Sequence, residues 1–212
     1  MKTKGLRVVH VVLLGVLVLS MDGCAFGNRH VTLNYPPEKQ SESEGLKVAE
    51  AAPVPVNGKP IILMQFVDQR SNKSVIGEVR NGWGMRTADV VAENDVSNWL
   101  TNAVRFELEK LGYKITLGTN NSESLSVIVL GGEVLHVYCT AMMTYEGEVS
   151  FFATLQKDGK ELLRKRYTGK GSAGMNWAAA SSSSGGSLSE ALSIALKDLV
   201  IDVNNTMNGQ NF

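Results

Sequence analysis

The chain has 212 residues, and its 21 Lys and Arg residues balance its 21 Asp and Glu residues. Without residues 1–23, 18 basic and 20 acidic residues remain, so we expect neither a basic surface for nucleic acid nor a polybasic patch for an anionic membrane. The stretch after the proline-rich region, about 150 residues, is long enough for one hydrophobic core and indicates a single domain.

Residues 1–24 have the features of an export signal that ends in a cysteine. Three basic residues precede an apolar run over residues 8–19, which is shorter than the roughly 20 residues of a membrane span. Cys24 follows Gly23 after this run, as in the lipobox of bacterial lipoproteins. This resemblance implies cleavage before Cys24 and attachment of lipid, palmitate included, to that residue.

Two residues depart from the usual lipobox, because Met21 and Asp22 stand where leucine and a small residue are common. An ordinary secretory signal with an unmodified Cys24 is therefore the alternative. Ala25 stands where an aspartate retains many lipoproteins in the inner membrane, so the resemblance implies the outer membrane, with the protein facing the periplasm. If Cys24 carries lipid, Cys139 has no intrachain disulfide partner, and stability must come from a packed core.

Residues 24–59 have the composition of a flexible tether. This region and its edge hold all the prolines of the chain, Pro36, Pro37, Pro53, Pro55 and Pro60. Apolar residues alternate over 31–35 and could add a strand to the domain edge, while the rest could span several tens of Å if extended. The predicted organisation is a signal peptide over residues 1–23, a lipid-anchored tether over 24–59 and one periplasmic α+β domain over 60–212.

The folded part opens with a continuous apolar run over residues 61–67, whose length and polar flanks predict a central strand. Residues 75–79 and 88–92 are weaker strand candidates. Asp95 or Asn94 can cap a helix whose apolar residues recur at helical spacing, and Gly112 can end that helix in a left-handed conformation.

A short strand is predicted at residues 113–117, and long β-rich segments follow at 125–139 and 144–156. Asp158-Gly159 is typical of a tight hairpin turn, so residues 148–156 should pair antiparallel with 161–168. Ser187 and Glu190 form a capping box that predicts the start of a second helix. The order of elements predicts an α+β fold, an antiparallel or mixed sheet with two helices packed on one face.

Few residues are candidates for catalysis. His30 lies in the predicted tether, and His136 is three residues from Cys139, which places the two on opposite faces of a strand unless a bulge intervenes. We therefore interpret His136 as structural. No set of His, Cys and carboxylate residues has the spacing of a metal site, so neither a metal nor a cofactor is expected.

Residues 169–174 match the pattern Gly-x-Gly-x-x-Gly, but a single helix follows them and not the βαβ unit of a dinucleotide site. We interpret residues 171–186, which are rich in Ser and Gly, as a flexible loop that would become ordered only against a partner.

Four residues are candidates for an interaction surface. Asp68 and Arg70 follow the first strand, lie on one face of it and can pair, although a turn fixed by hydrogen bonds to Asp68 is the alternative. Trp83 and Trp177 lie in predicted loops, where aromatic side chains are common interface anchors, although either could cover the core.

Several segments together resemble the YajG-like family of bacterial envelope lipoproteins: Asp68-Gln69-Arg70, the helix end at residues 106–113, the β meander over 127–155 and the terminal helix. The resemblance covers most of residues 31–207. It implies an envelope lipoprotein with an α+β domain, and it carries over no catalytic residue.

We therefore expect a non-enzymatic, outer-membrane-anchored lipoprotein whose periplasmic domain binds another envelope component, either a protein complex or the cell wall. The alternative is a small-ligand carrier, or a hydrolase that acts on lipid or cell-wall fragments. A deep apolar pocket with convergent polar groups would favour the alternative, and a filled core with a flat face would disfavour it.

Overall fold

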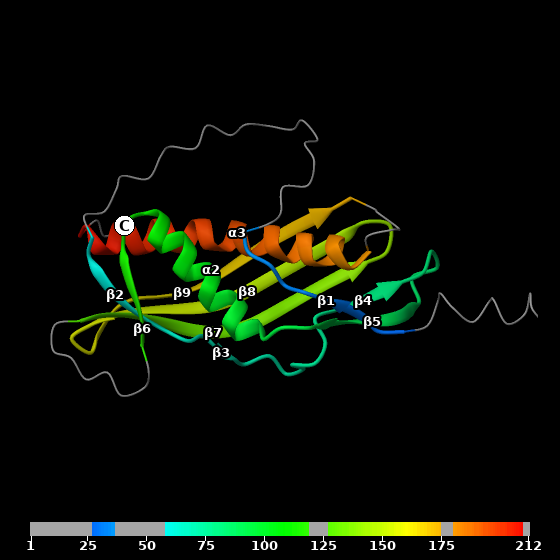
Figure 1. Ribbon diagram of the computed structural model, residues 1–212, viewed down its shortest axis with the longest axis horizontal. Coiled ribbons are helices and arrows are strands. Elements are labelled where there is room, and N and C mark those ends of the chain that lie inside the picture. The colour runs from blue at the N-terminus through cyan, green and yellow to red at the C-terminus, as the bar shows by residue number, and fades with distance from the viewer. Residues whose placement is uncertain (1–26, 37–57, 119–126, 175–179, 210–212) are drawn as a thin grey trace, which may run out of the picture.

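The computed structural model describes residues 27–36, 58–118, 127–174 and 180–209. Cys24 and Trp177 lie outside the described residues. Figure 1 shows a mixed sheet with two helices on one of its faces. This arrangement is the predicted α+β fold, with an open sheet and not a closed barrel.

Three long strands form an antiparallel meander: β7 (Ile128–Ala141), β8 (Tyr145–Lys157) and β9 (Lys160–Ala173). The turn between β8 and β9 contains Asp158 and Gly159, whose φ angles of 54° and 76° are the positive values that a tight hairpin turn requires. The predicted Asp-Gly hairpin is therefore confirmed, with Ser150 facing Thr168 in the register.

The other edge of β7 pairs in parallel with three short strands in succession: β2 (Pro60–Met64), β3 (Val67–Asp68) and β4 (Gly77–Arg80). β6 (Lys114–Gly118) lies beside β2, and β5 (Arg86–Ala92) pairs antiparallel with β4. The apolar run at residues 61–67 therefore forms two short strands and not one. Between them, the backbone N–H of Phe66 donates to the Thr101 hydroxyl (3.0 Å), a contact that sequence periodicity does not reveal.

An edge strand forms, but as β1 (Arg29–Val31), which shares only Val31 with the predicted range 31–35 and pairs in parallel with β5. Val31 and Leu33 are buried in the core. The Leu33 backbone N–H donates to Oδ1 of Asn94, and the Leu33 carbonyl accepts from Nδ2 of Asn94. The sheet therefore includes residues before the predicted domain boundary at residue 60.

The first helix of the domain, α2 (Val96–Lys110), begins and ends where the sequence predicts. The Asp95 carboxylate accepts a hydrogen bond from the backbone N–H of Asn98 (2.7 Å), and Gly112 has a φ of 89°. Every member of the predicted apolar stripe is buried: Val96, Leu100, Ala103, Val104, Leu108 and Leu111. The helix lies on the same face of the sheet as the terminal helix.

The terminal helix, α3 (Ala180–Met207), starts earlier than predicted. Ser187 is not its N-cap: it is buried inside the helix, and its hydroxyl donates to the Ser184 carbonyl (3.0 Å). Glu190 accepts a hydrogen bond from the backbone of Ser172 in β9 (2.7 Å) and does not close a capping box. The first turns contain serine and glycine, which are poor helix formers, but they pack against β1 and the residue after it. A Cβ on Gly185 would lie 3.3 Å from Cγ1 of Val31 and 3.2 Å from the Thr32 carbonyl oxygen.

The prediction of a flexible loop over residues 171–186 is wrong where the structure describes it. β9 continues to Ala173, and α3 occupies residues 180–186. The first two glycines of the Gly-x-Gly-x-x-Gly pattern have a packing role: a Cβ on Gly169 would lie 2.0 Å from the Ala191 carbonyl oxygen, and one on Gly171 would lie 2.4 Å from that of Ser187. These glycines let α3 approach the sheet more closely than any side chain allows.

The helices and the sheet enclose one continuous core. Its largest fully buried side chains include Phe66, Phe151 and Tyr167, and the rings of Phe66 and Phe151 meet edge to face with their centroids 5.7 Å apart. Within the described residues, neither helix is long and apolar enough to cross a membrane.

Candidate functional site

Asp68 and Arg70 lie in the wall of an open groove of about 1020 Å³, where β2 and β3 end beside the start of α2. The wall is mixed, with apolar side chains such as Met64, Phe66 and Val67 beside charged and amide side chains: Gln65, Asp68, Arg70, Lys73, Asn94 and Asp95. This shape differs from the deep apolar pocket that the carrier or hydrolase hypothesis requires.

The two predicted residues bind each other with two-point geometry. Arg70 donates from Nε to Oδ1 of Asp68 (3.0 Å) and from Nη2 to Oδ2 (2.8 Å), and its backbone N–H also donates to Oδ1 (3.1 Å). The guanidinium also reaches the Lys73 carbonyl (3.1 Å), so it stabilises the loop after β3. The predicted pairing is confirmed. These contacts match the alternative in which Asp68 fixes a turn, and a role in binding stays a prediction.

The environment of Asp68 keeps its carboxylate charged. Burial alone would raise the pKa of Asp68, but the hydrogen bonds and the positive charge of Arg70 outweigh burial and hold this pKa below its ordinary value. The side chains of Arg70 and Asp68 are only 5% and 15% exposed. A carboxylate held ionised in this way is suited to stabilising a loop and not to donating a proton near neutral pH.

Trp83 lies at the apex of the hairpin between β4 and β5, and 84% of its surface is exposed. The Asn81 side chain shapes this turn, since its Oδ1 accepts from the backbone N–H groups of Trp83 and Met85 (both 3.0 Å). Trp83 therefore does not cover the core, which was the alternative that the sequence left open.

A second hairpin tip lies next to that of Trp83. β4 runs parallel to β7 with Val79 opposite Ala141, so Met142 and Met143 follow β7 at the level where Asn81 follows β4. Both methionines are exposed, as is Met85. We call Trp83, Met85, Met142 and Met143 the tip cluster. The three methionines were not predicted, although a pair of methionines between two predicted strands was a visible signal.

The face of the β7–β8–β9 meander opposite the helices is covered by no other described element (Figure 1). We call its outward-facing residues the open sheet face: Glu133, His136, Tyr138, Phe152, Arg164, Arg166 and Lys170. The Arg164 guanidinium lies 5.8 Å from the centroid of the Phe152 ring, and Arg166 Nε donates to the Ser150 hydroxyl (2.7 Å). This surface was not predicted, although its residues alternate with buried ones along each strand.

A hollow of about 330 Å³ lies on the open sheet face beside Phe152. Gly131 and Gly132 of β7 line it together with Met64 of β2. Charged groups surround the hollow, namely Glu133, Glu161 and Arg164. An aromatic wall with both signs of charge at its rim resembles the centre of a protein-binding surface more than a catalytic cleft.

The predicted separation of His136 and Cys139 is confirmed. The His136 ring stacks on Tyr138 on the open sheet face, with centroids 5.8 Å apart, whereas Cys139 is fully buried on the other face. Its Sγ lies 3.4 Å from the Ser187 hydroxyl, and burial raises the pKa of the Cys139 thiol. A buried thiol with a raised pKa is a poor nucleophile. Nearby, burial and Glu78 raise the pKa of Tyr138.

The fold and these surfaces can be compared with known proteins. The sequence matches the profile of a family described as uncharacterized lipoproteins over residues 47–206. The chain belongs to the YajG-like family of lipoproteins. The predicted family is thereby confirmed, and membership supports a lipoprotein of the cell envelope. No curated protein sequence matches this lipoprotein.

Solved structures were compared with this fold. A protein from Xanthomonas campestris superposes with a TM-score of 0.52 at 14% identity, over 86% of this chain and 96% of the other. An uncharacterized protein (TM-score 0.49, 8% identity, 71% and 95% coverage) and a hypothetical protein from Chlamydia trachomatis (TM-score 0.47, 10% identity, 72% and 99% coverage) are also similar. The first similarity supports the fold alone.

Proposed function

We propose that this lipoprotein is held in the outer membrane by lipid on Cys24, and that its domain binds an envelope protein through the open sheet face without catalysing a reaction. The observation that carries the proposal is the composition of that face. Arg164, Arg166, Tyr138 and Phe152 are of the residue types that dominate binding energy at protein interfaces.

Balanced charge also supports a protein partner. Glu133 lies beside Phe152, which faces Arg166 on β9, and Tyr138 lies beside Glu148, which faces Lys170. Such alternation of sign along a surface gives specificity for a partner with the complementary pattern. A polyanion such as nucleic acid would meet carboxylates among these cations, since Lys170 lies 3.5 Å from Glu148 and Arg164 lines the hollow with Glu133 and Glu161.

The competing hypothesis, a carrier or hydrolase for lipid or cell-wall fragments, would use the groove beside α2. In that groove Asp68 and Arg70 bind each other, and Arg70 also donates to a loop carbonyl, so both side chains are less available to a ligand. The proposal therefore places binding on the open sheet face.

Site-specific photo-crosslinking in intact cells tests the binding surface. A photoreactive benzoylphenylalanine at position 152 should give one defined crosslinked product, and the same group at Ile201 should give none. Ile201 is a matched control because it is an exposed apolar residue of α3, on the other side of the domain. Equal products at both positions, or none at position 152, would count against the open sheet face.

The anchor is tested separately. Metabolic labelling with a fatty acid should mark the wild-type chain but not Cys24→Ala, and the labelled protein should fractionate with the outer membrane. Retention of the label by Cys24→Ala would contradict lipidation at that residue.

A further inference from the structure

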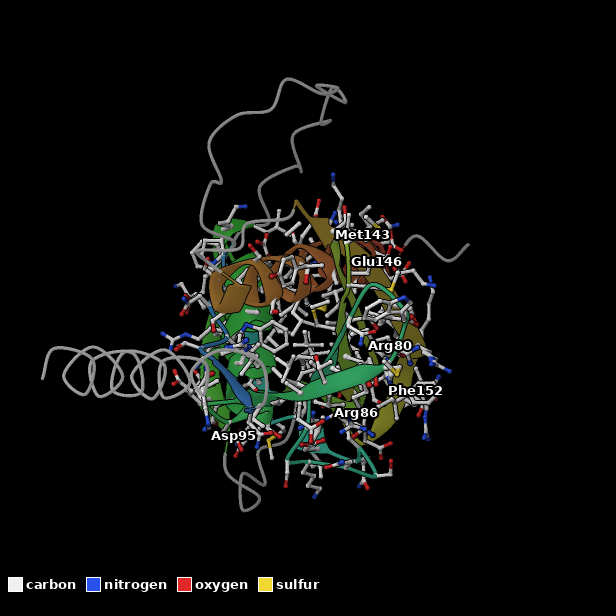
Figure 2. The ribbon with its side chains drawn as sticks, turned by 90° about the vertical axis from the view of Figure 1, so that its right-hand side faces the viewer. Arg80, Arg86, Asp95, Met143, Glu146 and Phe152 are labelled. Carbon is white, nitrogen blue, oxygen red and sulfur yellow. The ribbon has the colours of Figure 1, made fainter. Side chains whose placement is uncertain are left out.

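The tip cluster lies at the end of the domain where the chain enters the fold. Figure 2 looks onto this end, with Met143, Arg80 and Arg86 facing the viewer. β1 runs parallel to β5, and β5 begins at the hairpin that carries Trp83. Moving backwards along β1 from Val31 therefore leads towards the tip cluster.

The register of the strands limits how far Cys24 can lie from this end. Arg29 faces Val90, which is four residues from Arg86 at the base of the hairpin, a distance of about 13 Å along the strand. Cys24 precedes Arg29 by five residues, which span at most about 18 Å when fully extended. Cys24 can therefore lie no more than about 5 Å beyond the level of Arg86 in the direction of the tips.

This limit brings the tip cluster to the membrane surface. Trp83 is at the hairpin apex, one or two residues beyond Arg86, and so about 3 to 7 Å further out. An acylated Cys24 lies in the headgroup layer, which is about 5 to 7 Å thick on each side of the bilayer. With the strands along the membrane normal and the tips towards the bilayer, the apex of the hairpin and the acylated residue therefore reach the same depth, even when the connection is as long as it can be.

The chemistry of the tip cluster suits this layer. Tryptophan is enriched at membrane interfaces because its ring is apolar and its N–H is polar, and methionine is flexible and apolar. Arg80 flanks the cluster, and its side chain is 44% exposed, whereas the side chain of its partner Glu78 is 9% exposed. The cation therefore faces outward, where it can meet lipid phosphate groups. Arg86 is likewise more exposed than its partner Asp89. Glu146, an exposed acid, is also visible in this view.

From these observations we infer that the tip cluster is a membrane-contacting surface, which enters the phospholipid headgroup layer and holds the domain in one orientation. The inference rests on the proposed lipidation of Cys24, and it adds a second, protein-mediated contact to that anchor. The occupant of the surface is the lipid bilayer, and not a protein partner or a second copy of the chain.

The test uses the full lipidated chain in vesicles of phosphatidylethanolamine and phosphatidylglycerol. Trp83→Cys is labelled with an environment-sensitive fluorophore, which is selective because Cys139 is buried and Cys24 carries lipid. Leu162→Cys is the matched control, since Leu162 is an exposed apolar residue near the β8–β9 turn at the opposite end of the sheet. Met143→Cys serves as a second reporter in the tip cluster.

Quenching of the label by aqueous iodide should be several-fold weaker at positions 83 and 143 than at 162. Equal quenching at all three positions, in protein that floats with the vesicles, would overturn the inference and leave the lipid anchor intact. If mass spectrometry finds no lipid on Cys24 and the protein does not float, the proposed lipidation of Cys24 and the membrane contact of the tip cluster are both refuted. Protection at position 83 that persists in Cys24→Ala protein without vesicles would indicate contact with a second copy, and would also overturn the inference.

Discussion

The close contact between α3 and the sheet predicts that Gly169→Ala is strongly destabilising. The added Cβ would lie 2.0 Å from the Ala191 carbonyl oxygen and 2.8 Å from the Ala195 backbone nitrogen, whereas ordinary contact begins at 3.4 Å. Both obstacles are backbone atoms, so no side-chain rotation can relieve them. The helix must move away by about 1.4 Å from strands on which it packs along its length.

The magnitude follows from two opposing effects. Overpacking costs typically about 1 to 3 kcal/mol, and a rigid obstacle places this site at the upper end. Replacing glycine reduces the entropy of the unfolded chain, which offsets about 0.4 to 1 kcal/mol. The expected net loss is about 2 to 3 kcal/mol, a large part of the total stability of about 5 to 15 kcal/mol of an ordinary domain.

Urea denaturation followed by circular dichroism measures this loss. With a slope of about 2 kcal/mol per M, the midpoint for Gly169→Ala should fall by about 1 to 1.5 M. Gly174→Ala is the matched control, because a Cβ there has no atom within 4 Å and the residue lies just after the same strand. Its stability should change by less than about 0.5 kcal/mol. If the two variants unfold at the same midpoint, the packing explanation of the glycine pattern is refuted.

Three further predictions concern single side chains. Asp68→Asn should cost about 1 to 3 kcal/mol at pH 7. Because the folded-state pKa of Asp68 is lowered, its contribution is present above the unfolded pKa of about 3.9 and is lost as pH falls further, so the difference from wild type should shrink in denaturation curves at pH 3. Trp83→Ala should leave the unfolding midpoint unchanged, since the ring is 84% exposed, whereas Trp99→Ala, at a buried ring, should cost about 3 to 5 kcal/mol. Cys139 should react with a maleimide only as fast as the domain opens, and rapid reaction in native buffer would contradict its burial beneath α3.

Local signals predicted those elements whose determinants are close together in the chain. The Asp158-Gly159 turn needs only two residues that tolerate positive φ, and α2 needs only an acidic cap at Asp95, an apolar stripe and Gly112. Each of these was read from fewer than twenty consecutive residues. The core face of α2 was likewise apparent from helical spacing alone.

The start of α3 and the role of residues 169–174 could not be read in this way. Serine and glycine have low helix propensity, so residues 180–186 resemble a loop until the packing partners are known. The partners lie far away in sequence, as when Gly185 lies against Thr32 and Gly169 lies against Ala191. Propensity was outweighed by close packing of the helix on the sheet.

The candidate surfaces also divide into those that local sequence reveals and those that only the tertiary structure reveals. Trp83 was singled out from its loop context, and the pairing of Asp68 with Arg70 from their spacing. The open sheet face depended on knowing which side of the meander the helices cover, and the tip cluster depended on β4 lying beside β7. Side chains that share a surface from different strands cannot be grouped before the strand order is known.

By itself, the sequence determined the α+β class, the hairpin and the limits of α2, because these follow from hydrophobic periodicity, turn chemistry and capping over short stretches. It determined the family through its similarity to other members over residues 47–206. Tertiary structure alone decided the parallel pairing of β2, β3 and β4 with β7, the full length of α3 and the position of β1. It thereby also decided that the hairpin tips and the entry of the chain lie at one end. These features depend on contacts between residues distant in sequence, and their free energies appear only when the backbone segments have been brought together.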